Sequence, residues 1–389
     1  MAISLTLIPV SLPGDGRIPT RTILRDIVAA FLTDEWPLVD PEALTASWHT
    51  SFANYDCTLE RPKPNLATST TEPQKVFIKF HKKHTAVDAD VFKHLIPTKQ
   101  EEALLCHEYS RSGLGAEVHG FFQTQDGTLG RVEQFLDARN MEPEDVENSI
   151  VRADVARALA AFHAMEMPLL LEEKAVPMGP HAFYEALTNG IKKYLGMDKV
   201  KGLGREAGVN MDELIDYDFG PRLKKVVEKL ESVGAKKGWC IHDVQFMNVL
   251  VRNHPRPRES TIFLVDFEFA MRNYRAVDIG GHFMQKMFKW FDEETKIADC
   301  RRYAEDEKRH FCEEYAAGWN ELTGDSDTGE QVFAEAEYGY MVAIAFDVHN
   351  MLCYISSEDD RDPSNLRALS KLFKEFVDQY ARLGIDESR

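Results

Sequence analysis

The chain reads Trp239-Cys-Ile-His-Asp-Val-Gln-Phe-Met-Asn-Val-Leu-Val at residues 239–251 and Thr261-Ile-Phe-Leu-Val-Asp-Phe-Glu-Phe at residues 261–269. The apolar runs 249–251 and 262–265 are typical of two strands, and the Asn-His-Pro-Arg-Pro sequence between them is typical of a turn. Asp243 and Asn248 precede the first strand and Asp266 ends the second, so a hairpin would bring two carboxylates and an amide oxygen together. Oxygen ligands of this kind suit Mg²⁺.

The order of these residues indicates a phosphotransferase. Kinases place a hydroxyl-orienting Asp, an Asn five residues later and an Asp-Phe pair after the next strand, and the last two bind metal. Taken singly, each residue has an ordinary structural explanation, because Asp forms turns before strands and Asn forms Asx-turns in loops. The ordered set on one hairpin favours the kinase interpretation.

The residues after the second strand carry a resemblance to a known family. They read Val265-Asp-Phe-Glu-Phe-Ala-Met-Arg-Asn-Tyr-Arg-Ala-Val-Asp-Ile-Gly-Gly-His-Phe283, which resembles the choline/ethanolamine kinase family in its Asp-Phe-Glu, Asn-Tyr-Arg, Asp-Ile-Gly and His-Phe elements. The segments Gly120-Phe-Phe, Gly130-Arg-Val-Glu-Gln-Phe135 with Arg139, and Ala161-Phe-His-Ala-Met-Glu-Met-Pro168 resemble the lobe junction of that family and the helix after it. The resemblance runs through most of residues 100–290 and is patchy over residues 1–100.

The resemblance implies a fold and a chemistry. The fold would be a two-lobed, protein-kinase-like α+β fold, with a small antiparallel-sheet lobe at residues 1–137 and a larger, mostly helical lobe at residues 138–389. The reaction would use ATP and Mg²⁺. Length and a hydrophobic content of 44% in 389 residues allow two or three domains, so two lobes are compatible with the composition.

Composition restricts the partners. The net charge of −18 and a pI near 5.2 argue against a nucleic acid or an anionic membrane, and are compatible with a small cationic substrate. The six cysteines form no CxxC pair, so the sequence indicates neither a disulfide framework nor a zinc site. No apolar run reaches the roughly 18 residues of a membrane span, so we expect a soluble cytoplasmic protein. The sequence leaves the oligomeric state open, with a homodimer as one option.

The first lobe is expected to bind the nucleotide. We expect strands at residues 51–59 and 75–80 and helices at residues 21–31 and 98–112. Lys79 would lie off the packed face of its strand and resembles the lysine that contacts nucleotide phosphates, although a solvated strand lysine is the alternative. Glu102 matches the family's helix glutamate that would pair with Lys79, with Glu101 as an adjacent rival.

The phosphate-covering loop departs from the family. Such loops need glycine for close backbone approach, yet no glycine lies between Gly16 and Gly113. Residues 48–54 take the place of the family's glycine-containing loop, and Ser51 or Asn54 would supply side-chain hydrogen bonds instead. The segment Glu133-Gln134-Phe135-Leu136 resembles the hinge strand along which an adenine would lie, so Glu133 and Phe135 are candidate nucleotide contacts.

The second lobe is expected to be helical. We predict helices at residues 149–165, 181–195, 218–233, 338–354 and 364–383, with a Gly/Lys-rich connector at residues 196–210. His163, near the apolar end of the first of these helices, is interpreted as a packing residue. Ile241 stands where the family has a loop-bracing His, which questions the rigidity of the catalytic loop. Asp278 would tie that loop to a neighbouring helix, with Arg275 as a candidate partner.

The resemblance also suggests roles in catalysis. Asp243 would orient the substrate hydroxyl and take its proton, and Gln245 would lie near that hydroxyl. Asn248 and Asp266 would hold the metal, and Glu268 would reach a second Mg²⁺ or the substrate ammonium.

The residues expected to bind the substrate depart more from the family. Quaternary ammonium groups are typically held by aromatic faces, and Trp290 occupies an aromatic position of the family. Gln285 replaces a family Glu, and Val348 and Met351 stand where the family has two cage tryptophans. The aromatic residues Tyr340, Phe346 and Tyr354 are candidates to rebuild the cage.

Three functions therefore remain open. The first is an ATP-dependent kinase making phosphocholine or phosphoethanolamine. The second is a kinase of the same fold that acts on another hydroxylated amine. The third is a pseudokinase that binds ligand without transfer, suggested by the missing loop glycines and by Ile241. Retention of Asp243, Asn248, Asp266 and Lys79 together argues against the third.

Overall fold

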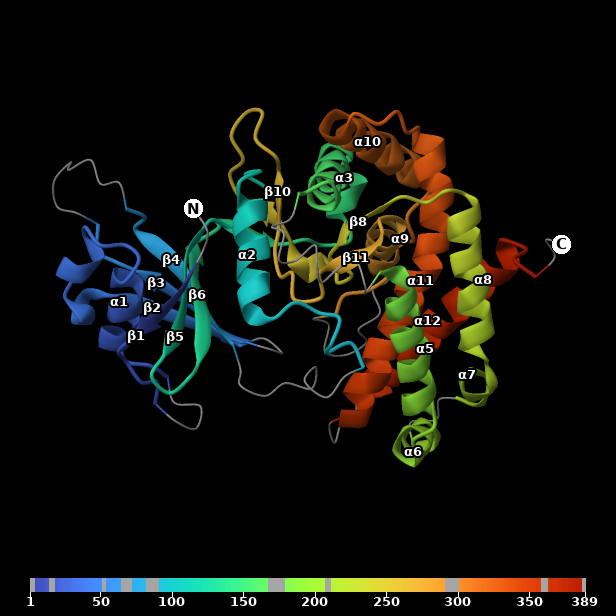
Figure 1. Ribbon diagram of the computed structural model, residues 1–389, viewed down its shortest axis with the longest axis horizontal. Helices are drawn as coiled ribbons and strands as arrows, with labels where there is room; N and C mark the ends of the chain where they lie inside the picture. Colours follow the sequence, from blue (N-terminus) through green and yellow to red (C-terminus); the bar gives the residue numbers. More distant parts are fainter. Residues whose placement is uncertain are drawn as a thin grey trace. The chain divides into compact units, whose positions relative to one another are not determined.

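The structure is a computed structural model that describes residues 4–13, 18–50, 54–63, 72–81, 91–166, 179–206, 211–290, 301–357 and 363–386. The chain forms two compact units (Figure 1). The first comprises Met1–Thr85 and Pro97–Ala138, and the second comprises Ala86–Ile96 and Arg139–Arg389. The division falls one residue beyond the predicted boundary at 137. The grouping of residues 91–96 with the second unit was not predicted.

The first unit is built on a six-stranded sheet. Its strands follow the spatial order β1-β5-β6-β4-β3-β2. The β1 and β5 strands are parallel and every other neighbouring pair is antiparallel. The strands are β1 (Leu5–Ile8), β2 (Thr45–Thr50), β3 (Asn54–Glu60), β4 (Lys75–His81), β5 (Val118–Thr124) and β6 (Leu129–Gln134).

Two helices flank this sheet. The helix α1 (Arg21–Ala29) buries Leu24, Ile27 and Val28, whose i, i+3, i+4 spacing places them on one face, against the core of the unit. The helix α2 (Lys99–Ser110) begins with a capping box in which Thr98 and Glu101 exchange hydrogen bonds. The capping box commits the Glu101 carboxylate to the helix terminus.

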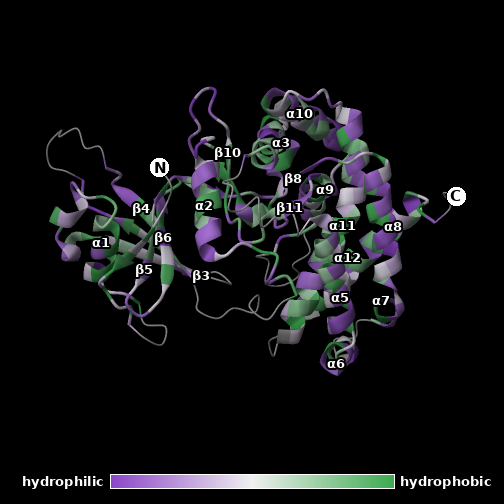
Figure 2. Cartoon of the chain, in the orientation of Figure 1, coloured by the Kyte–Doolittle hydropathy of each residue, from purple (hydrophilic) through white to green (hydrophobic). Residues whose placement is uncertain are grey.

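The second unit is mostly helical. Its helices are α3 (Ser149–His163), α5 (Pro180–Leu195), α6 (Asp198–Glu206), α7 (Asp212–Asp216), α8 (Phe219–Ser232), α9 (Ala276–Gln285), α10 (Glu305–Thr323), α11 (Gly329–Ser357) and α12 (Pro363–Arg382). Figure 2 shows purple and green residues along α8, as expected of a helix that buries Leu223, Val226 and Leu230 and exposes its lysines.

Two small sheets lie among these helices. One has the order β10-β9-β7, formed by Ile262–Leu264, Val249–Arg252 and Ala138–Asn140. The other pairs β11 (Met271–Tyr274) with β8 (Lys237–Cys240) in antiparallel fashion. Polar side chains that follow β8 and β10 are therefore held by short, fully paired strands.

Glycines bring α9 and α11 into backbone contact. A Cβ added at Gly280 would lie 2.1 Å from the backbone nitrogen of Tyr340, and one at Gly339 would lie 1.9 Å from the carbonyl oxygen of Ala276. Neither site accepts any larger residue without moving a helix. Residues further along α9 and α11 consequently face each other at a fixed spacing.

Three expectations need correction. Residues 196–210 were expected to be a connector, but Asp198–Glu206 forms α6. The helix predicted at residues 338–354 extends to Gly329–Ser357. The strand predicted at residues 51–59 is β3 at Asn54–Glu60, and residues 48–50 of the predicted phosphate loop belong to β2, while residues 51–53 lie outside the described residues. In the part of the chain that the structure describes, no helix has both the length and the apolar character to cross a bilayer.

Candidate active site

The β9–β10 hairpin places Asn248 beside Asp266. Val249 pairs with Leu264, and the backbone nitrogen of Val265 donates to the carbonyl oxygen of Asn248 at 3.0 Å. Asn248 therefore lies opposite Val265 in the hairpin, one residue before Asp266. The backbone of Asp266 has a φ of 66°, a left-handed value that a non-glycine residue adopts at some cost and that is common at functional sites.

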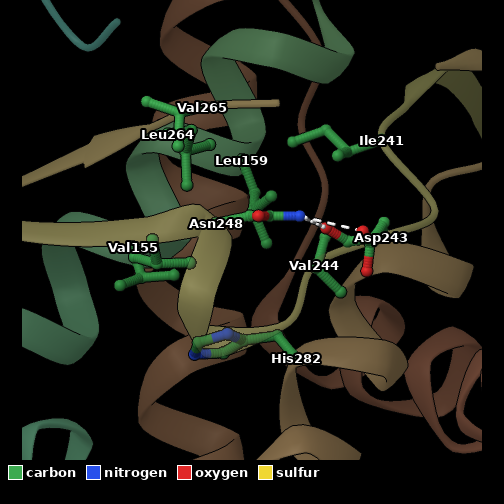
Figure 3. Close-up of a pocket in the computed structure, with 10 residues that line it drawn as sticks. Val155, Leu159, Ile241, Asp243, Val244, Asn248, Leu264, Val265 and His282 are labelled. Atoms are coloured by element: carbon green, nitrogen blue, oxygen red, sulfur yellow. Dashed lines mark hydrogen bonds between the residues drawn. The ribbon is translucent and has the colours of Figure 1, made fainter. Parts of the chain in front are cut away.

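Asp243 lies at the centre of a polar cluster (Figure 3). The amide of Asn248 donates to its Oδ2 atom at 2.9 Å and to its carbonyl oxygen at 3.0 Å, as Figure 3 shows. The amide of Gln245 also donates to Oδ2 at 2.9 Å. Since the Asn248 nitrogen is used in this way, the amide oxygen is the atom left to bind a cation. The Oδ1 atom of Asp243 remains available to a substrate.

Burial raises the pKa of Asp243 to about 6, and the negative charge of Asp266 adds to the effect, against the opposing hydrogen bonds from Gln245 and Asn248. Behind the cluster is a cavity of about 10 Å³, room for about one water molecule. Its walls are largely apolar and include Val155, Leu159, Val244 and Leu264 (Figure 3). A dry wall of this kind disfavours the ionised carboxylate.

A buried carboxylate holds the loop that carries Asp243. Asp278 accepts hydrogen bonds from the backbone nitrogens of Ile241 at 2.5 Å and His242 at 2.8 Å, and it lies 3.0 Å from Nε2 of His163. Burial opposes ionisation of Asp278, but the contact with His163 and these backbone donors hold its pKa below the usual value. The Nδ1 atom of His163 lies 2.8 Å from the Tyr315 hydroxyl.

The side chain of His242 braces the same loop. Its Nε2 atom lies 2.9 Å from the Asn273 amide nitrogen, which can only donate, so Nδ1 carries the proton and donates to the carbonyl oxygen of Cys240 at 3.2 Å. Burial lowers the pKa of His242, which keeps the ring neutral. Its φ of 63° turns the chain toward Asp243.

These contacts revise three expectations. His163 is a hydrogen-bonding member of the brace, where a packing role was predicted. Arg275 does not pair with Asp278, because its guanidinium is taken by Glu335 and Asp327. The missing histidine at Ile241 does not leave the loop unsupported, because His242 and Asp278 hold the backbone on either side of it.

A second carboxylate, not predicted from the sequence, is close enough to Asp243 for the two charges to interact. Asp347 of α11 is half-buried and accepts a hydrogen bond from the amide of Gln285 at 2.9 Å. The Gln285 oxygen accepts from the indole nitrogen of Trp290 at 2.7 Å, and Trp290 stacks on Phe288 with ring centroids 4.6 Å apart. Burial, followed by the charge of Asp243, raises the pKa of Asp347 to about 8.

Asp347 left a signal in the sequence. It is the one ionisable carboxylate in the apolar run Met341-Val-Ala-Ile-Ala-Phe-Asp-Val-His-Asn-Met-Leu352. A buried charge is expensive unless it is paired or used. An acid within such a run is therefore a candidate functional residue.

The candidate cage residues divide into two groups. The Tyr340 hydroxyl donates to Glu375 at 2.8 Å, and Phe346 is buried in a cluster with Phe92 and Phe183, so the suggestion that these two rebuild a cage is wrong. Met351 and Tyr354 are half-buried and lie four and seven residues beyond Asp347. That spacing places all three on one face of α11.

In the first unit, Lys79 and Glu102 lie together. Glu102 is fully buried, its carboxylate lies 3.9 Å from the Lys79 ammonium, and Arg131 donates to it at 2.8 Å. Burial opposes the charge of Glu102, but Arg131, Lys99 and Lys79 hold its pKa well below the usual range. Lys79 is buried rather than solvated, and Glu102, not the capping Glu101, is its partner.

The remaining nucleotide candidates are also in the first unit. The Glu133 side chain accepts from Arg131 at 2.7 Å, so any contact with an adenine would come from the backbone near it. Phe135 is half-buried, with the Lys75 ammonium 3.8 Å from its ring centroid. Ser51 lies outside the described residues, and so does the side chain of Asn54.

The oxygen atoms near the hairpin fit a hard divalent cation. Asn248 offers an amide oxygen, and the carboxylates of Asp266 and Glu268 lie on the loop that follows β10. Such all-oxygen donor sets suit Mg²⁺. Asp278, Cys240 and His163 also lie within metal-binding distance of one another, but Asp278 and His163 are committed to the brace.

This geometry agrees with what comparisons of the sequence show. A family model described as choline/ethanolamine kinase matches residues 54–364. The chain belongs to this family. The family prediction is confirmed, and the family is one of small-molecule kinases, the class of enzyme that the sequence predicted.

Relatives within the family are distant. A human choline/ethanolamine kinase is 25% identical over 74% of this chain and 67% of its own length. Mouse choline kinase alpha is 26% identical over 61% of this chain and 49% of its own length. The match thus spans about half to two thirds of the length of these kinases.

Solved structures confirm the two-lobed, kinase-like α+β fold. A choline kinase of Cryptosporidium parvum aligns with a TM-score of 0.62 at 12% identity, over 94% of this chain and 96% of that one. An ethanolamine kinase of Plasmodium vivax aligns with a TM-score of 0.59 at 17% identity, over 92% and 90%. At these identities the likeness shows the fold alone.

Proposed function

We propose that the protein transfers the γ-phosphoryl group of ATP to the hydroxyl of choline or ethanolamine. The observation that carries this proposal is the Asp243 cluster, in which a half-buried carboxylate with a raised pKa lies beside two groups able to bind a cation. A base with a pKa near 6 is ionised at neutral pH and still basic enough to accept a proton as the transition state forms.

The reaction is an in-line displacement. The Oδ1 atom of Asp243 accepts the substrate O–H and takes the proton as the new O–P bond forms, and the bond from the γ-phosphorus to the β–γ bridging oxygen breaks to release ADP. Gln245 and Asn248 fix the carboxylate by their bonds to Oδ2. Positioning of this kind supplies much of the catalysis in phosphoryl transfer.

Metal and nucleotide roles belong to the same proposal. Mg²⁺, held by Asn248, Asp266 and Glu268, would neutralise charge on the transferring phosphoryl oxygens. Lys79, oriented by Glu102 at 3.9 Å, would neutralise the α- and β-phosphates. Glu133 and Phe135 are proposed to lie near the adenine, and Ser51 and Asn54 near the phosphates.

The proposed substrate charge, oligomeric state and location rest on the sequence alone. A net charge of −18 favours a small cation over a nucleic acid. A homodimer and a cytoplasmic location remain predictions from the sequence.

Labelled ATP and a panel of amino alcohols test the proposal. We expect label on choline or ethanolamine in the presence of Mg²⁺, and a fall in kcat of about 10³-fold in Asp243→Asn, since a positioned base contributes on the order of 10²–10⁴. Glu330→Gln, which removes a surface charge at the start of α11, is the matched control. Transfer only to another alcohol, or binding without turnover, would reject the proposal in favour of the alternative kinase or the pseudokinase.

A further inference from the structure

Asp347 is in an unfavourable place for an acid. It lies on α11 between Phe346 and Val348, which are 1% and 0% exposed, and it is itself half-buried. Among the residues that the structure describes, no lysine, arginine or histidine forms an ion pair with its carboxylate, and the amide of Gln285 is its one hydrogen-bond donor. A half-buried carboxylate with one neutral donor has spare acceptor capacity.

The groups around Asp347 add negative charge. Asp243 is close enough for its charge to raise the pKa of Asp347. Gln285, the last residue of α9, is buried. Its amide oxygen accepts a hydrogen bond from the Trp290 indole, and its amide nitrogen donates to Asp347. The backbone contact of α9 and α11 at Gly280 and Gly339 holds Gln285 and Asp347 at this spacing. A cation that binds at Asp347 would therefore compensate negative charge and favour the ionised form of this carboxyl.

The chemistry of the site distinguishes between cations. A primary ammonium has three N–H donors that carboxylate oxygens accept directly, whereas a trimethylammonium has none and is held by aromatic faces. Next to Asp347 on the same face of α11 is the aliphatic Met351, and the buried neighbour Val348 is also aliphatic. Trp290 and Tyr354 are the nearby aromatic residues, and the Trp290 ring is already stacked on Phe288 and bonded to Gln285, so Asp347 is the group that can accept hydrogen bonds from an ammonium here.

We propose that Asp347 binds the ammonium group of the substrate and makes the enzyme prefer a primary amine, ethanolamine, to choline. The inference rests on the proposed function, because it names the substrate of the same site. Asp347 is a specificity residue in this proposal. Asp243 remains the group that contacts the reacting hydroxyl.

Steady-state kinetics with both amines test the inference. In the parent enzyme we expect a kcat/KM for ethanolamine at least tenfold above that for choline. In Asp347→Asn we expect the KM for ethanolamine to rise about 10- to 100-fold, the range of one charge-assisted hydrogen bond. We expect kcat and the KM for ATP to change less than threefold, and the values for choline to change little.

Two further variants separate binding from structure. Asp347→Glu keeps the charge and should restore part of the ethanolamine preference. The double variant Asp347→Asn, Gln285→Glu exchanges the carboxylate and the amide of this hydrogen-bonded pair. Because one carboxylate is again present, the KM for ethanolamine should fall. Glu330→Gln, with the same loss of charge at the start of α11, should leave both amines unaffected.

Calorimetric binding of ethanolamine and choline without nucleotide gives an independent result. If turnover of both amines is absent but ethanolamine binds more tightly and loses that advantage in Asp347→Asn, the proposed function fails and the inference stands. Tighter binding of choline by the parent protein overturns the inference. Equal losses for both amines in Asp347→Asn also overturn it, because a merely structural residue would affect them alike.

Discussion

The two sides of Asp243 differ in how their buried polar groups are satisfied. On the loop side, Asp278 receives two backbone donors and lies 3.0 Å from His163, and its pKa is held below the ordinary value. On the side of α11, Asp347 has one neutral donor, and its pKa is raised to about 8. The same residue type therefore stabilises the fold in one place and opposes it in the other.

The difference separates a carboxylate that stabilises the fold, Asp278, from one that is a candidate to bind a ligand, Asp347. A buried charge with every oxygen bonded fixes a backbone, and removing it leaves several unsatisfied donors. A buried charge without a cation is tolerated only where something else compensates for it, as at sites that bind substrates. The contrast between Asp278 and Asp347 can therefore be tested by mutating each.

The largest effect is expected on the loop side. Asp278→Asn replaces an acceptor oxygen by an NH₂ group that faces backbone donors, so we expect the free energy of unfolding to fall by about 3 kcal/mol. Because the loop carrying Asp243 loses its brace, kcat should fall about 100-fold under conditions where the variant is folded. Chemical denaturation and steady-state kinetics measure the two effects.

Glu335→Gln is the matched control for this variant. It weakens another buried ion pair, with Arg275, that does not hold the loop. It should lower stability with less than a tenfold change in kcat. If both variants reduce kcat equally, the brace has no special role in positioning Asp243.

The next effect concerns the ionisation of Asp243. With a pKa of about 6, its basic form is lost as the pH falls, so kcat at saturating substrate should decline about tenfold per pH unit below pH 6 and level off above pH 7. The profile should be recorded from pH 5 to 8, with circular dichroism to verify folding at each point. A flat profile down to pH 5 would show that Asp243 is not raised in pKa, or is not the base.

The smallest effect is the change in stability on mutating Asp347. A carboxyl whose folded-state pKa lies above its unfolded value binds its proton more tightly when folded, so stability is lost as pH rises from about 4 to about 8. Asp347→Asn removes that loss. Allowing for partial solvent screening, we expect this variant to be about 2 kcal/mol more stable than the parent at pH 8.5.

The pH dependence of that gain is the decisive reading. The advantage of Asp347→Asn should shrink steadily as the pH is lowered toward 4, below which both states of the parent carry the proton. Thermal or urea unfolding at several pH values measures it. If Asp347→Asn is less stable than the parent at every pH, Asp347 stabilises the fold as Asp278 does.

The sequence predicted what local order determines. Asp243, Asn248 and Asp266 lie within 24 residues, so a strand–turn–strand pattern is enough to bring them together. Glu101 and Glu102 were left as rivals, because the capping box that separates them depends on the backbone at Thr98. The order of strands in the six-stranded sheet was not predicted, since it depends on pairings between distant segments.

Residues that work across long distances in the chain were missed. Asp347 is 104 residues from Asp243, and its relation to Gln285 depends on how closely α9 and α11 pack. His163 appeared to be a packing residue because its partners, Asp278 and Tyr315, are 115 and 152 residues away. Periodicity shows that such a residue is buried, but it does not show which polar group it meets.

The glycine contact between α9 and α11 limits how this enzyme can change during evolution. Where two backbones touch, a single added methyl at Gly280 or Gly339 would push the helices apart. The spacing of the two helices is therefore fixed, and new substrate preferences must arise from side-chain substitutions on their facing sides, at positions such as 285, 347 and 351. Laboratory selection for a different amine should accumulate substitutions there while leaving both glycines untouched.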